Sequence, residues 1–238
     1  MNARLDALLS WLDPTRGKVP FEPAPGVGRF DMGVAALFVP AALFAALVIT
    51  APLALQPGTT GDLTGAVGTV ENAAVAAAMP APWSWVYGAG DVACHQKAAR
   101  SFSLGGNQMP FCARDLGIFA LIAATLAACI PARSRAYRAA VLMPWWGYFA
   151  LLAPIALDGG AQAVFGIESD NLRRLLTGGL AGVAVAFALV FIVYEGRYAW
   201  HRSLGGRATR RRQGEAGDRA SAATGSSGSK DVESAPTE

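Results

Sequence analysis

Four long apolar runs, separated by charged segments, constrain this chain more than any other feature. They lie at residues 32–55, 116–132, about 139–157 and about 172–196. Only 16% of the chain is charged, against about 25% in a typical soluble domain, and the charges fall mainly between the runs. Because a charge in hydrocarbon costs several kcal/mol, this distribution predicts an all-α integral membrane protein with about four transmembrane helices plus one or two interfacial helices.

The length and composition of the runs agree with spans. The first run has about 24 residues, which at about 1.5 Å each gives roughly 36 Å, enough to cross a hydrocarbon layer of about 30 Å with some tilt. The fourth run contains Gly178, Gly179 and Gly182. Small residues on one helix let a neighbouring helix approach closely, so we expect a tight helix contact there.

The remaining segments divide the chain into three regions. Residues 1–31 contain a short amphipathic helix at 2–13, placed on the membrane surface or docked on the protein itself, and a linker; they lack the apolar core of a cleavable signal peptide. Residues 32–199 form the transmembrane domain, with an interfacial helix at 83–95 that carries Trp83, Trp85 and Tyr87. Residues 200–238 are rich in Arg, Ser, Gly and Ala, which predicts a disordered tail.

The arginines and lysines predict the orientation. Short basic segments precede the first run, connect the second run to the third, and follow the fourth. With four spans these segments share one side, which the positive-inside rule places in the cytoplasm together with both termini. A cell membrane location follows, with the lipid bilayer as partner. We expect no nucleic acid partner, because the run Arg210 to Arg212 next to a membrane helix is explained as a topology signal.

The residues with unusual chemistry gather on the opposite, outer side. The segment 94–119 contains two cysteines and a histidine, and residues 158–174 add charged and amide side chains. In this topology they meet at the outer ends of spans two, three and four. Thiolate, imidazole and carboxylate groups are the ligands that Zn²⁺ uses in proteins. We therefore predict a zinc site at Cys94, His95, Cys112 and Asp115, in a polar cap with Arg100, Ser101, Asp158, Gln162, Asn171 and Arg174.

The wording and order of these motifs resemble the prokaryotic membrane-protein family catalogued as domain of unknown function 2085. The resemblance covers about residues 80–195 and rests on the strings CHQ-x-x-x-RSF, G-x-Q-x-P-x-CAR, DGG-x-Q and N-x-x-R-x-x-TG. It implies a membrane protein and supplies no established activity. The family's usual pattern has a second cysteine three residues after the position of Cys112, where this chain has Asp115.

Structural interpretations stay open beside the metal site. Asp115 would act as a helix cap or a favourable charge at the positive end of the helix dipole. Cys94 and Cys112 would form a disulfide in an oxidising compartment. Asp158, followed by two glycines, would form a turn. We also expect Arg174 to be buried and paired with an acidic residue, with Asp158 as the best partner.

Three functions are consistent with these features. In the first, a membrane enzyme or metal-binding protein has a site that opens outward, where Arg174 and Asp158 orient a polar or anionic substrate. In the second, a non-enzymatic scaffold uses the same residues to hold the outer end of the bundle together. The third, a transporter or channel, is disfavoured because no charged residue lies in the middle of a span.

Overall fold

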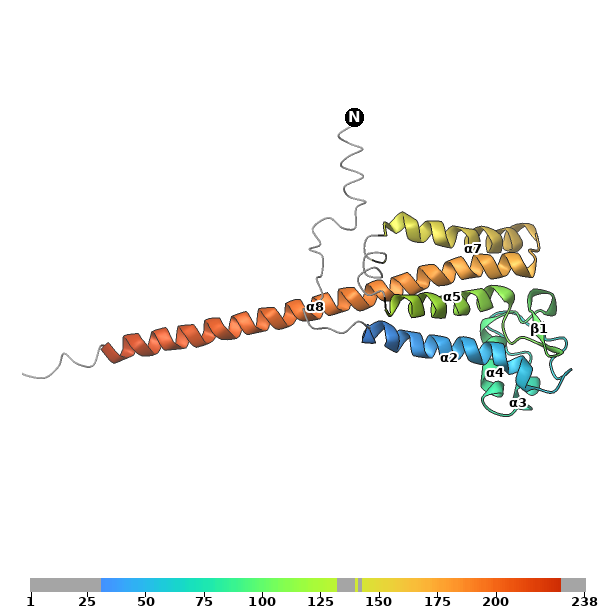
Figure 1. The fold of residues 1–238 in the computed structure, drawn as a ribbon, viewed down its shortest axis with the longest axis horizontal. Helices are drawn as coiled ribbons and strands as arrows, with labels where there is room; N and C mark the ends of the chain where they lie inside the picture. The colour runs from blue at the N-terminus through green and yellow to red at the C-terminus, as the bar shows by residue number, and fades with distance from the viewer. Residues whose placement is uncertain (1–30, 132–139, 141–142, 228–238) are drawn as a thin grey trace, which may run out of the picture. The chain divides into compact units, whose positions relative to one another are not determined.

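The computed structural model describes residues 31–131, 140 and 143–227. This part of the chain is mostly helical, with one two-stranded hairpin (Figure 1). The predicted amphipathic helix at 2–13 lies outside the described residues. The elements, in chain order, are α2 Met32–Ala54, α3 Ala73–Ala77, α4 Trp83–Ala93, the 3₁₀ helix η1 Ala98–Arg100, β1 Ser103–Leu104, β2 Asn107–Gln108, α5 Ala113–Cys129, α7 Trp145–Phe165 and α8 Asn171–Ser227.

Three helices of the described chain are long and apolar enough to cross a bilayer. They are α2, α7 and the part of α8 from Asn171 to Arg197. The predicted second span corresponds to α5, which has 17 residues. That length lies at the short end of the range for spanning helices, about 17–25 residues. The described chain therefore has three candidate spans by length and composition, and α5 is not one of them.

The third apolar helix begins and ends later than the sequence predicts. We expected a span at about 139–157 that stops at Asp158, and α7 instead runs from Trp145 to Phe165. The alternative in which Asp158, Gly159 and Gly160 form a turn is wrong, because these residues are helical. The helix ends at Gly166, which adopts the left-handed conformation (φ 66°) that favours glycine at a helix C-terminus.

The last helix also differs from expectation. We expected disorder from residue 200 onward, and α8 continues to Ser227. The segment 200–227 contains no proline and many residues with good helix propensity, such as alanine, arginine and glutamine. Without an apolar pattern the segment has no face that would pack against the rest of the protein, but its backbone can still be helical. The chain divides into two units at Val193 and Tyr194, and the candidate site lies entirely in the first.

Helices α5 and α8 run in the same direction with their backbones in close approach. A Cβ at Gly117 would lie 2.3 Å from the carbonyl oxygen of Leu175, and one at Gly182 would lie 2.5 Å from that of Ile118. These distances are too short for any residue but glycine. The predicted tight contact at the glycines of the fourth run is confirmed, with α5 as the neighbour.

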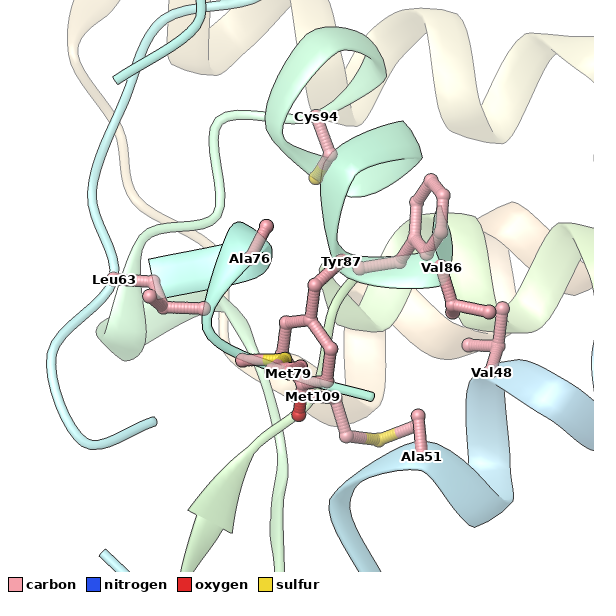
Figure 2. Close-up of a cluster of buried hydrophobic side chains, with 10 residues drawn as sticks. Val48, Ala51, Leu63, Ala76, Met79, Val86, Tyr87, Cys94 and Met109 are labelled. Carbon is pink, nitrogen blue, oxygen red and sulfur yellow. The ribbon is translucent and has the colours of Figure 1, made fainter. Parts of the chain in front are cut away.

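The start of α2 lies beside the end of α5, because the Asp31 amide donates to the Ile130 carbonyl at 3.2 Å. The two helices are therefore antiparallel. Figure 2 shows the core between α2 and the outer segments, where Val48 and Ala51 of α2 lie near Tyr87 and Met109. Three phenylalanines from α2, α5 and the segment before α5 pack edge to face around this core, with ring centroids 4.9–5.7 Å apart: Phe44, Phe111 and Phe119.

The hairpin β1–β2 reverses the chain before α5. Gly105 and Gly106 both have positive φ, 59° and 77°, which a two-residue hairpin turn requires. Asn107 then donates to the carbonyls of Pro52 and Gln56, both at 3.0 Å, and ties the hairpin to the end of α2. This reversal brings the end of α4 to the start of α5.

Candidate metal centre and polar cap

The two cysteines of the site stand at helix ends. Cys94 is the C-cap of α4, and its amide donates to the Gly90 carbonyl at 2.9 Å. Cys112 is the N-cap of α5 and has extended backbone. Gly90 allows this junction, since a Cβ there would lie 2.0 Å from the Pro110 carbonyl oxygen. The close contact between the backbones of Gly90 and Pro110 therefore keeps Cys94, at the end of α4, near Cys112, at the start of α5.

Cys94, Cys112 and Asp115 come together in space. One ligand atom from each lies within 4.8 Å of the others. The Cys112 amide donates to the Cys94 sulfur at 3.3 Å, and the Cys112 thiol donates to the Asp115 carboxylate at 3.3 Å. Both cysteines are free thiols, so the structure shows no disulfide between them. Two sulfurs and a carboxylate oxygen at this spacing are an appropriate ligand set for a tetrahedral ion such as Zn²⁺.

The two thiols differ in acidity. A hydrogen bond from the Cys94 thiol lowers the pKa of Cys112, although burial and Asp115 act in the opposite direction. The same hydrogen bond, followed by burial, raises the pKa of Cys94. Cys112 is thus the thiol that loses its proton more readily, and a cation placed between the two sulfurs would favour the deprotonated form of both.

Asp115 and His95 occupy different positions relative to this group. Asp115 lies in the first turn of α5, where a negative charge interacts favourably with the helix dipole. It is not the helix cap, because that position belongs to Cys112. His95 is exposed, and its ring is not part of the three-residue group. The structure therefore brings together three of the four predicted ligands.

Beside the thiols, two carboxylates organise the polar cap. Asp158 of α7 is buried and forms ion pairs with Arg114 and with Arg173 Nε, the latter at 3.0 Å. The Ser169 hydroxyl donates to the same carboxylate at 3.3 Å. A carboxylate inside a membrane helix is costly unless it is paired, so these partners from α5 and α8 explain why Asp158 is tolerated there.

The second carboxylate, Glu168, accepts from Arg100 and from Arg174 Nη2, the latter at 2.5 Å. Arg174 Nη1 also donates to Asn171 at 3.1 Å, and Asn171 donates to the Ser101 carbonyl at 3.3 Å. Bonding to Arg100, and the positive charges of both arginines, lower the pKa of Glu168.

Arg174 is buried and paired with a carboxylate, as the sequence predicts, and the predicted partner is wrong. It pairs with Glu168, whereas Asp158 takes Arg114 and Arg173. Asp158 lies inside α7 rather than at its end, so its carboxylate meets the guanidinium of Arg114, in the first turn of α5, instead of that of Arg174.

Sequence reasoning did not include Arg114 or Arg173 in the cap, although both are basic residues on the outer side, where the positive-inside rule does not expect them. We call Arg100, Arg114, Arg173 and Arg174 the cap arginines.

A cavity of about 310 Å³ lies between the thiols and the cap. Gln162 of α7 lies on its wall between two arginines, and with its amide oxygen turned toward Arg100 it accepts from Nε at 3.1 Å. Its walls are formed by residues of α5, α7 and α8 and of the segment after α4. The lining residues are Cys94, His95, Lys97, Arg100, Cys112, Arg114, Gly159, Gln162, Ala163 and Arg174.

The candidate site lies in the part of the chain that is similar to other proteins. Residues 94–188 match the family model described as "Predicted membrane protein (DUF2085)", and every candidate site residue lies within that range. An uncharacterized protein of Methanocaldococcus jannaschii is 32% identical over 110 residues, which is 46% of this chain and 69% of the relative. An uncharacterized protein of Methanothermobacter thermautotrophicus is 36% identical over 95 residues, 39% of this chain and 80% of the relative. No solved structure matches the chain.

Proposed function

Because the chain belongs to the DUF2085 family of predicted membrane proteins, we propose that it is a multi-pass membrane protein that binds zinc outside the membrane through Cys94, Cys112 and Asp115. The observation that carries the proposal is the convergence of the three ligand atoms within 4.8 Å. The position of Asp115 holds a cysteine in the family's usual pattern. A carboxylate is also a zinc ligand, so the replacement keeps a donor there.

Three protein ligands leave one tetrahedral position open. Catalytic zinc sites have this arrangement, whereas structural sites use four protein ligands. Cys94 and Cys112 both line the 310 Å³ cavity, so the open position would face it and accept water or a bound molecule. A membrane enzyme with a zinc-activated water is the activity this arrangement favours. His95 lines the same cavity and becomes a fourth ligand only if its segment moves inward.

We infer four spans, with α5 as the fourth. It packs parallel to α8 through glycine contacts and antiparallel to α2, which supports a position at the same depth as these two apolar helices. Four spans that alternate in direction along the chain would put residues 56–113 and 158–171 outside and both termini in the cytoplasm.

A cysteine introduced as Gly61→Cys tests the orientation. Gly61 has open space around its Cβ position, and an impermeant thiol reagent should label the variant in intact cells above the wild-type background. Protection in intact cells with labelling after lysis would reverse the topology.

Metal content tests the central proposal. The full chain, purified in detergent with a reducing agent and dialysed after zinc loading, should retain about one zinc per chain by elemental analysis. Cys94→Ala and Asp115→Asn should lose most of it. Cys129→Ala is the matched control, because Cys129 is a buried free thiol outside the ligand group. Equal zinc in all four proteins, or none in the wild type, would exclude the site.

A second candidate function is a non-enzymatic scaffold. It is favoured by the Asp158 carboxylate, which links α7 to α5 and α8 through two arginines. A wild-type chain that retains no zinc but depends strongly on Asp158 for stability would support the scaffold instead.

A further inference from the structure

We propose that the cavity beside the thiol pair binds a phosphate group, carried by a lipid or by a soluble phosphorylated molecule. Four cationic side chains line it: Lys97, Arg100, Arg114 and Arg174. No carboxylate is among the lining residues. This site is defined by guanidinium and ammonium groups, so it does not depend on the zinc proposal.

The charges around the cavity do not balance within the described part of the chain. The four cap arginines share only two carboxylates, those of Asp158 and Glu168. Lys97 makes no ion pair there, and the Asp115 carboxylate contacts the Cys112 thiol instead. Five cations thus have only two ion-paired carboxylates among them, and the other two carboxylates nearby bond to the Cys112 thiol (Asp115) and to the Arg173 amide (Asp170). The cations still outnumber the carboxylates, and a bound anion would offset this positive charge.

Buried donors without partners give an independent indication. Arg174 is 2% exposed, and its two Nη atoms are bonded, but its Nε has no partner. Arg114 Nε is also buried and without a partner. Both side chains line the cavity. The two Nε atoms have almost no accessible surface, so they do not face the cavity directly. A buried donor left without an acceptor costs about 1–3 kcal/mol, so a rotation of either side chain that turned its Nε toward acceptor oxygens in the cavity would be favourable.

The number of donors favours a phosphate over a carboxylate. Guanidinium groups pair with both through two parallel hydrogen bonds, but a phosphate has more oxygens and can therefore bond to several arginines at once. The N-cap and first turn of α5 supply two lining residues, Cys112 and Arg114, so the positive end of that helix dipole lies beside the cavity, as at many phosphate sites.

The surroundings are compatible with two carriers of the phosphate. Leu157, Val164 and Phe165 of α7 are 72–74% exposed, but at about 100° per residue Leu157 and Val164 lie on the opposite face of the helix from the lining residues Gly159, Gln162 and Ala163. This apolar surface therefore does not select a lipid over a soluble phosphorylated molecule. The experiment below separates the two.

Two variants test the site without removing an ion pair of the cap. Lys97→Gln removes one lining charge, and Ala163→Leu fills the cavity without changing charge. Arg207→Gln, the same loss of one charge outside the transmembrane domain, is the control. The full chain in neutral detergent would be titrated at constant ionic strength with inorganic phosphate and with phosphatidic acid, with chloride and phosphatidylcholine as reference ligands. Thermal stability and native mass spectrometry report binding, and zinc content is measured in parallel.

The wild type and Arg207→Gln should bind a phosphate ligand, and Lys97→Gln and Ala163→Leu should bind it roughly three- to tenfold more weakly. A response to inorganic phosphate as strong as to phosphatidic acid indicates a soluble ligand, and a response to phosphatidic acid alone indicates a lipid. No response to either phosphate, or equal responses in all four proteins, would overturn the proposal. Zinc content unchanged in Lys97→Gln separates this result from the outcome of the metal proposal.

Discussion

The contact between α5 and α8 predicts different effects for two similar substitutions, Gly178→Ala and Gly160→Ala. Gly178 is in α8, and a Cβ there would lie 2.1 Å from the carbonyl oxygen of Arg114. Ordinary contacts of a Cβ are 3.4–4 Å, so Gly178→Ala must move the two backbones apart by about 1 Å or more. Gly160 of α7 is also helical, but a Cβ there meets nothing within 4 Å.

The two changes share one favourable term. Alanine in place of glycine stabilises a helix interior by up to about 1 kcal/mol. At Gly160 this is the main effect, so Gly160→Ala should be neutral or slightly stabilising. At Gly178 the forced separation costs about 1–3 kcal/mol or more and also displaces Arg114 from Asp158. We expect a net loss of roughly 1–3 kcal/mol, which corresponds to a Tm lower by about 2–12 °C for a chain of this size.

Thermal unfolding in detergent, followed by the fluorescence of the six tryptophans, measures both effects. Gly117→Ala on the facing helix serves as a second test, since its Cβ would lie 2.3 Å from the Leu175 carbonyl oxygen. If Gly178→Ala and Gly160→Ala unfold at the same temperature, α5 and α8 are not in backbone contact. The inference that α5 lies at the depth of the spans would then rest on its contact with α2 alone.

Two further predictions concern the carboxylates of the cap. Asp158→Asn should lower the free energy of unfolding by about 3 kcal/mol, because it leaves Arg114 without its buried partner; a loss below 1 kcal/mol in thermal unfolding would contradict this role. The Glu168 pKa is lowered from 4.5 by its arginines, so its contribution to stability is present above pH 4.5 and is lost as the pH falls through the lower folded-state pKa. The wild type should therefore lose more thermal stability than Glu168→Gln between pH 6 and pH 3. The difference should be small, because the Glu168 side chain is 57% exposed. Parallel pH profiles of Tm for the two proteins would refute this role of Glu168.

The sequence by itself determined the membrane class, the apolar helices and the proximity of three ligand residues. A bilayer selects for composition within one contiguous segment, so α2 and the apolar part of α8 can be read without knowing what packs against them. The approach of Cys94 to Cys112 was also a local matter, because Gly105 and Gly106 reverse a short connection. Asp115 follows from its position one helical turn after Cys112.

Only the tertiary structure decided which charges pair and where the cavity lies. The choice of Glu168 rather than Asp158 for Arg174 depends on how far each helix extends and how it is rotated about its axis, and neither is encoded in a hydropathy pattern. The continuation of α7 past Asp158 put that carboxylate within reach of α5. His95 adjoins Cys94 in the sequence but stays outside the ligand group, because the direction of a side chain after a helix end is set by the local backbone and not by spacing along the chain.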